Sequence, residues 1–285
     1  MRKRGLLFLF AVAFGLLLCG CVRSDANIPL LVSETPMPDI ALGEHGKGFT
    51  CTGIAYDPVE NVYYIGNCGK ARFEDEQFHA TIVKVSKDDF QYIDEIRLYE
   101  IYPAMSDIQG ITIDTSDNTI YFCSTIENRI RHITTDGKDK GEIYAEHPTG
   151  IAYDSRTDTL WVLSKQRLMQ MDKSGEVIRS FDLTLEGQDH IFLDKAKNTI
   201  YLTAGNNYNG ENYVYRVQLL FNRVSLAYVL KESYAVEGIY IEDDTIYILN
   251  DGYYHTAKNP VNQVSQYDLS KLMTENEYEI YMGNP

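Results

Sequence analysis

A motif that recurs five times along the chain limits the possible folds more than any other feature. The copy at residues 109–134 reads as a strand that ends in an acidic residue, a short polar turn, a second strand, a loop and a third strand. The other copies begin at Thr52, Gly150, His190 and Glu237. Self-similarity at a period of about 40 residues is the signature of a repeat architecture.

The second strand of each copy carries branched and aromatic residues on both faces, as in TIYFCS at residues 119–124, and therefore suits a sheet packed on both sides. A β-propeller satisfies this pattern. We predict an all-β fold, a propeller with four-stranded antiparallel blades. Five blades account for the chain, and a six-bladed ring with one degenerate blade is the alternative. Either residues 28–41 or a strand at 278–282 could close the ring.

The first 20 residues have the composition of a secretory signal peptide. Arg2, Lys3 and Arg4 precede an apolar run that is shorter than the roughly 20 residues needed to span a bilayer. The ending Leu-Cys-Gly-Cys resembles the bacterial lipobox, which implies cleavage before Cys21 and lipid on that residue. We expect a signal peptide at 1–20, a lipid-anchored tether at 21–27 and a single propeller domain at 28–285, exported and held at the membrane of the bacterial cell envelope.

The chain is acidic, with a net charge of −15 that becomes −18 once the three basic leader residues are removed. Such a surface repels phosphate backbones, so we expect no nucleic-acid partner. Cations are the more natural partners, although acidity could serve solubility alone. We expect a monomer.

The hairpins set a register that collects polar residues at one end. If Asp114 lies opposite Thr119, then Gln109 lies opposite Ser124. The same register pairs Thr52 with Asn67, Thr149 with Ser164, Asp189 with Ala204 and Glu237 with Asn250. Because the first strand of each propeller blade lines the channel, these residues, with His190 and Asp251, would ring one mouth. This ring is the candidate ligand-binding site, and the alternative is that strand ends are simply polar.

Three long loops leave the hairpins at the same end as this ring, at residues 68–80, 205–212 and 251–262. Loops on a rigid scaffold are where binding residues usually lie. Their Asn, Gly and Tyr residues suit a sugar or a peptide, or serve only as turn formers.

Three cysteines remain after Cys19 and Cys21 are assigned to the leader and the anchor. The hairpin register places Cys51 opposite Cys68, and directly opposed residues in an exported protein can form a disulfide. We therefore predict a bond between Cys51 and Cys68. Cys123 lies within a strand and is expected to be a buried, inert thiol.

The copies resemble the NHL-type and gluconolactonase-like propellers, and most closely the SdiA-regulated propellers of bacteria. The resemblance lies in GI-x-x-D followed by TIY-x-x-S, in Glu237-Gly238-Ile239 and in Asn250-Asp251. Gluconolactonase-like enzymes hold a divalent metal with a Glu from an E-G motif. The resemblance thus implies a possible calcium site formed by Asp189, Glu237, Asn250 and Asp251. The other ring positions depart from that pattern.

The sequence favours binding over catalysis. It has no phosphate-binding glycine loop, no zinc-protease helix motif and no serine nucleophile elbow. We predict a lipid-anchored module that binds a small molecule, a glycan or an envelope protein through the channel mouth. The alternatives are a calcium-dependent, lactonase-like hydrolase that uses the ring around Glu237, and an envelope scaffold protein.

Overall fold

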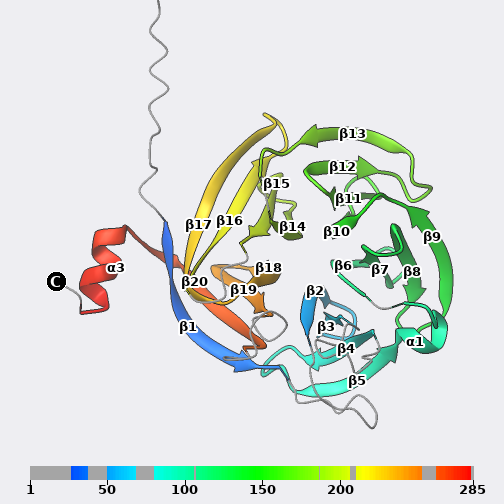
Figure 1. Ribbon diagram of the computed structural model, residues 1–285, viewed down its shortest axis with the longest axis horizontal. Coiled ribbons are helices and arrows are strands. Elements are labelled where there is room, and N and C mark those ends of the chain that lie inside the picture. Colours follow the sequence, from blue (N-terminus) through cyan, green and yellow to red (C-terminus); the bar gives the residue numbers. More distant parts are fainter. Residues whose placement is uncertain are drawn as a thin grey trace, which may run out of the picture.

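The computed structural model is a ring of five β-sheets around a central channel (Figure 1). It describes residues 27–37, 50–68, 80–105, 107–185, 187–205, 210–251 and 261–283. Within these residues each sheet has four antiparallel strands. The five-bladed propeller predicted from the repeat is confirmed, and the six-bladed alternative is wrong. The predicted signal peptide and the lipidated Cys21 lie outside the described residues.

The first four blades each use four consecutive strands, ordered from the channel outwards. Blade 1 comprises β2 (Cys51–Asp57), β3 (Val62–Asn67), β4 (Thr81–Ser86) and β5 (Tyr92–Arg97), followed by the short helix α1 (Leu98–Ile101). Blade 2 comprises β6 (Ile111–Asp114), β7 (Thr119–Ser124), β8 (Arg129–Thr134) and β9 (Asp139–Tyr144). Blade 3 comprises β10 (Pro148–Asp154), β11 (Thr159–Ser164), β12 (Arg167–Met171) and β13 (Val177–Asp182). Blade 4 comprises β14 (Gln188–Asp194), β15 (Thr199–Ala204), β16 (Gly210–Gln218) and β17 (Arg223–Ser233).

Blade 5 is completed by the N-terminal strand. β18 (Val236–Glu242), β19 (Thr245–Asn250) and β20 (Gln263–Met273) are joined at the outer edge by β1 (Ile28–Pro36), which runs antiparallel to β20 (Figure 1). Of the two ends that could close the ring, the N-terminal one does so. The strand expected at 278–282 is wrong, because that stretch belongs to the helix α3 (Glu275–Tyr281), whose start is fixed by a capping box between Thr274 and Glu277.

The tight turn of each inner hairpin follows from the residues that form it. Asp114 ends β6 and accepts a hydrogen bond from the backbone N–H of Ser116 at 2.9 Å, an Asx turn. The last turn residue, Asn118, has a φ of 55°, which asparagine tolerates better than most residues. Asp114 then pairs with Thr119, as the sequence predicted. Blades 1, 3 and 4 repeat this device, with left-handed residues Asn61, Asp158 and Asn198.

Each inner strand contains a bulge near its first residues. In blades 1, 3, 4 and 5 the register shifts by one residue between positions 51 and 54, 148 and 150, 188 and 191, and 236 and 239. In blade 2, Cys123 bonds to both Gln109 and Gly110 through the backbone. The predicted register is therefore correct up to the bulge and wrong by one residue beyond it, because a bulge sets two residues against one.

The second strands are the most buried elements. Every residue of β3, β7, β11 and β15 is buried, as expected for strands packed between neighbouring layers on both faces. Adjacent blades share the apolar clusters that result, for example Ile82, Phe122 and Ile133 between blades 1 and 2. Among the residues described, no helix is long and apolar enough to cross a membrane.

Candidate functional site

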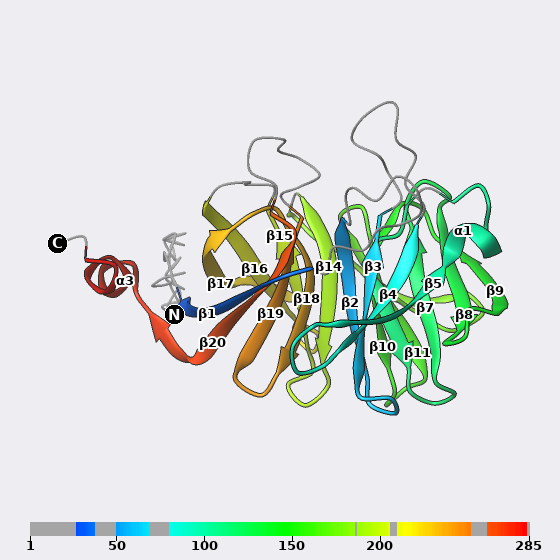
Figure 2. The same ribbon diagram turned by 90° about the horizontal axis from the view of Figure 1, so that it is seen from below.

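The channel has two mouths, which are distinguished by the direction of the inner strands. The inner strands start at the upper mouth and turn into the second strands at the lower mouth (Figure 2). The strands that flank all three predicted long loops meet at the upper mouth, while most of the loop residues lie outside the described part of the chain. The bulges also lie at this end.

Three carboxylates come together at the upper mouth. Asp189 and Glu237 occupy equivalent bulge positions in the neighbouring blades 4 and 5, and Asp251 directly follows β19. Asp251 is 3% exposed, whereas Asp189 and Glu237 are half-buried. A bulge re-aims the side chains it contains, which explains how two strands direct acidic residues to one place. We call these three residues the upper carboxylates.

Burial opposes the ionisation of all three upper carboxylates, and charge repulsion adds to this effect at Glu237 and Asp251. Burial raises the pKa of Asp189 to about 7. Burial also raises the pKa of Glu237 well above its ordinary value, and the neighbouring Asp189 and Asp251 raise it further. The pKa of Asp251 is raised by burial and by Asp189. Buried like charges with perturbed pKa values are typical of functional sites.

Two of the three upper carboxylates have no ion-pair partner among the described residues. Neither Asp189 nor Glu237 forms an ion pair with a lysine or arginine within the ranges given above. The same ranges contain no group of three or more His, Cys, Asp or Glu side chains placed to hold a metal ion. Within the described residues, the three acidic members of the calcium site implied by the family resemblance are therefore not placed as a metal-ligand group.

Two of the predicted ring residues are asparagines with a structural role. The side-chain oxygen of Asn250 accepts from the backbone N–H of Tyr234 at 2.8 Å, and its amide nitrogen donates to Ser265 Oγ at 2.9 Å. Asn67 makes the matching pair of bonds in blade 1, to Thr50 and Thr81. Both asparagines are fully buried. Because their amides are already used to fix the start of the inner strand, we leave them out of the proposed site.

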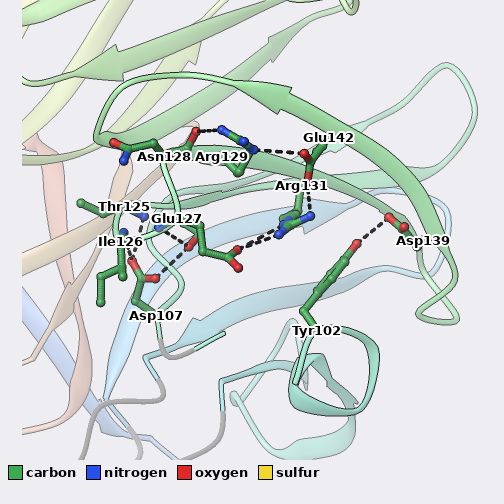
Figure 3. A network of polar contacts seen from close by, with 11 residues as sticks. Tyr102, Asp107, Thr125, Ile126, Glu127, Asn128, Arg129, Arg131, Asp139 and Glu142 are labelled. Carbon is green, nitrogen blue, oxygen red and sulfur yellow. Dashed lines mark hydrogen bonds and ion pairs between the residues drawn. The ribbon is translucent and has the colours of Figure 1, made fainter. Parts of the chain in front are cut away.

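The predicted serines also have partners, which lie in the segments that precede the inner strands of the same blades. Ser124 Oγ donates to Asp107 at 2.8 Å, and Figure 3 shows the same carboxylate turned towards the backbone of Thr125 and Ile126, at 2.7 and 3.1 Å. Ser164 Oγ donates to the carbonyl of Glu146. These bonds fix the loop after β7 and the approach to β10, so the serines belong to the scaffold.

The remaining ring positions differ among themselves. Thr52 is buried, and its hydroxyl donates to the carbonyl of Gln109 at 3.4 Å, which links blades 1 and 2. Thr149 and Gln109 are half-buried, and Thr149 Oγ1 has no partner among the described residues. The structure thus leaves Thr149 and Gln109 as the neutral members of the upper mouth.

His190 was predicted to face the upper mouth, and the structure places it deeper in the channel. It occupies the position that the other blades fill with Gly53, Gly110, Gly150 and Gly238. A Cβ atom added at Gly110 would lie 2.7 Å from the Cα of Gly150, so most inner strands approach too closely for a side chain. His190 Nε2 instead accepts a hydrogen bond from Ile111 N, in the non-adjacent blade 2, at 3.2 Å. The imidazole therefore spans the channel.

The predicted disulfide between Cys51 and Cys68 is not present in the structure, and the register that suggested it is wrong by one residue. Cys51 lies opposite Asn67, and both cysteines are buried thiols. The pKa of Cys51 is raised by burial and by the nearby Asp251 and Glu237, so this thiol resists ionisation. Cys123 is a buried thiol whose pKa is raised by burial and by Asp107, as expected for an inert residue.

Sequence reasoning missed the lower half of the channel. A cavity of about 130 Å³ lies there, lined by Tyr56, Tyr153, Phe192, Tyr240 and Lys195 among others, with His190 in its wall. The signal was present in the repeat, since each of these inner strands carries an aromatic residue one or two positions before its acidic end.

Comparison with known proteins supports the fold. No family model matches the chain, and no curated protein matches it in sequence. A chain of a nidogen/laminin complex is similar in structure at 15% identity, with 79% of each chain covered and a TM-score of 0.55. A Bacteroides thetaiotaomicron protein of unknown function is similar at 12% identity over 78% of this chain and 60% of that one, with a TM-score of 0.53. At these identities the likeness shows the β-propeller fold alone.

Proposed function

We propose that the chain is a binding module whose upper mouth accepts a positively charged organic group, such as an amine or a guanidinium, on a small molecule or on a partner protein. The observation that carries this proposal is the cluster of three upper carboxylates, with Asp189 and Glu237 lacking an ion pair within the described residues. Burial raises the pKa of all three, and repulsion by neighbouring carboxylates raises those of Glu237 and Asp251 further. A cation placed among them would relieve both effects.

The geometry favours an organic cation over a metal. A metal ion needs several oxygen ligands that converge at about 2.4 Å, and the described side chains do not converge in this way. An amine or a guanidinium instead forms separate charge-assisted hydrogen bonds, which carboxylates at different distances can satisfy. The acidic surface of the chain would also steer a cation towards the channel.

Thermal unfolding at pH 8 with and without a probe tests this function. We expect L-arginine methyl ester or putrescine to raise the melting temperature of the wild-type protein relative to sodium chloride at equal ionic strength, because a ligand that binds the folded state stabilises it by mass action. The effect should disappear in Glu237→Gln. It should persist in Glu242→Gln, a matched control at the opposite end of β18. Stabilisation by calcium alone, reversed by chelator, would contradict the organic-cation proposal.

We propose further that this module works outside the cytoplasm, tethered through lipid on Cys21. The support is the basic and apolar leader that ends in Leu-Cys-Gly-Cys. Expression of Cys21→Ser in a bacterial host, followed by membrane fractionation and a carbonate wash, tests the tether. The wild-type protein should remain with the membrane and the variant should not. A variant that stays with the membrane would contradict lipid anchoring.

A further inference from the structure

We infer that the lower channel is a second binding site, separate from the upper mouth, for a small neutral molecule that has an apolar body and one carbonyl-type hydrogen-bond acceptor. The acceptor would bind to Nδ1–H of His190, and the apolar body would lie against the aromatic residues of the inner strands. This inference rests on different residues from the proposed function and holds whether or not the upper mouth binds a cation.

The first step of the argument is the protonation of His190. Its Nε2 accepts a hydrogen bond from a backbone N–H, so this nitrogen carries no proton. A neutral imidazole must then carry its proton on Nδ1. Burial lowers the pKa of His190 to about 4, which keeps the ring neutral at physiological pH. Nδ1–H is therefore a fixed hydrogen-bond donor.

The second step is that this donor lacks an acceptor. His190 is 2% exposed, and its Nδ1 has no hydrogen-bond partner among the described residues. A buried donor left without a partner costs about 1–3 kcal/mol. The other four blades avoid this cost by placing glycine at the same position. A donor retained at such a cost, in the wall of a cavity, points to a ligand.

The third step is that three of the polar side chains around the cavity already have partners. Tyr56 Oη donates to Asn61 at 2.7 Å, and Tyr153 Oη donates to Asp158 at 2.8 Å. Lys195 Nζ, near the rim, donates to Ser155 Oγ at 2.9 Å. These three groups need no partner from a ligand, whereas the buried Nδ1–H of His190 does, so the acceptor of the ligand would be directed at His190.

The size and lining of the cavity define the rest of the ligand. The cavity measures about 130 Å³ and is walled mainly by Ile54, Ile113, Ile151, Phe192 and Tyr240, with further aromatic rings nearer the turns. Apolar cavities of about 150 Å³ accommodate a benzene-sized molecule. A ligand of this kind would have about six to eight non-hydrogen atoms. A charged ligand would lose its hydration shell against these walls, so a neutral one fits best.

Two probes of the same shape test the inference. Cyclohexanone carries a carbonyl acceptor, and methylenecyclohexane replaces that oxygen with a CH₂ group. We would titrate each into ¹⁵N-labelled protein and follow the imidazole nitrogens of His190 by NMR. We expect both probes to bind saturably and cyclohexanone to bind about 3- to 10-fold more tightly, the effect of one net hydrogen bond. Only cyclohexanone should shift the Nδ1 resonance strongly.

Three variants make the test decisive. His190→Phe keeps a ring in the channel but removes the donor, and it should abolish the difference between the probes. If this variant does not fold, Ala152→Leu, which fills part of the cavity wall, should weaken both probes at least tenfold. Glu237→Gln should leave both affinities unchanged. Equal affinity of the two probes for the wild-type protein, or an Nδ1 resonance that responds to neither because the cavity holds water only, would overturn the inference.

Discussion

The two mouths of the channel treat their acidic residues differently. At the lower mouth every inner strand ends in an acidic residue that has a partner. At the upper mouth the carboxylates of Asp189 and Glu237, on two neighbouring inner strands, form no ion pair with a described residue. The lower partners are the backbone N–H of Val59 for Asp57, Lys173 for Asp114, Arg156 for Asp154, Lys197 for Asp194 and Lys87 for Glu242. The pKa values diverge accordingly. Burial alone would raise the pKa of Asp154, but the hydrogen bonds and the charge of Arg156 lower it. Burial raises the pKa of Asp189 to about 7.

This difference separates scaffold from site within one repeated motif. The lower carboxylates stabilise the fold because they fix the hairpin turns. The upper carboxylates destabilise the empty protein, since buried like charges repel one another. A destabilising cluster of this kind is expected where it contributes to ligand binding, because proteins tolerate locally unfavourable interactions at their functional sites.

The largest expected effect that tests this comparison is the pH dependence of the free energy of unfolding. The folded-state pKa of Asp189 lies above its unfolded value near 3.9, so the folded protein binds the proton more tightly. The contribution of Asp189 to stability is therefore present at low pH and is lost as the pH rises from about 4 through 7. Between pH 5 and pH 8 we expect this contribution to fall by about 2–3 kcal/mol, while His190, whose pKa is lowered to about 4, contributes a rise of about 2 kcal/mol. Urea denaturation of the wild-type protein and of Asp189→Asn at the two pH values isolates the share of the carboxylate, and an equal pH dependence of the two proteins would contradict the cluster.

The next effect concerns a lower carboxylate. Asp154→Asn keeps the side-chain oxygen that accepts from the backbone of Arg156 but removes the ion pair with its guanidinium, which is 2.8 Å away. Asp154 is buried, so its loss should lower the free energy of unfolding at pH 7 by about 1–3 kcal/mol. Urea denaturation of wild type and variant gives the value. A gain in stability would mean that the two mouths do not differ as we describe.

The smallest expected effect is a gain in the free energy of unfolding, opposite in sign to the effect of Asp154→Asn. Glu237→Gln removes one of three mutually repelling carboxylates and keeps the shape of the side chain. We expect the ligand-free variant to be more stable than wild type at pH 8 by about 1 kcal/mol, with a smaller difference at pH 5, because the raised pKa of Glu237 favours its neutral form as the pH falls. Glu242→Gln, at the other end of β18, loses a half-exposed ion pair with Lys87 and should change stability by less than about 1 kcal/mol at either pH. Loss of stability in Glu237→Gln would make Glu237 a structural residue.

The sequence predicts the scaffold well because its signals are local. The turn after Asp114 and the strand at 119–124 follow from residue preferences within a few positions, and the structure confirms both. The bulge could not be predicted in this way. The inner strands that carry the bulges, such as β2 and β10, are buried at nearly every position, so hydrophobic alternation does not fix their register and an extra residue leaves no trace in the pattern.

The candidate site was predicted in part. Asp189, Glu237 and Asp251 were proposed from their places in the repeat, and the structure brings them together. Asn67 and Asn250 occupy similar places in the repeat, but their side-chain amides form hydrogen bonds with scaffold residues that the sequence alone does not bring together. His190 was noticed, but its position opposite Ile111 depends on a contact between blades 4 and 2 that no local pattern encodes.

The closure of blade 5 by β1 has a consequence for how the chain folds. Ile28 pairs with Met273, so β1, the first strand of the described residues, can pair with β20 only after almost all of the propeller has been synthesised. Closing so long a loop is entropically costly and slow compared with forming the hairpins. Until then both partners offer open edges to any other strand. The ring is therefore most vulnerable to aggregation while its ends are apart, and the β1–β20 seam is the place where a peptide mimic of β1 would arrest assembly.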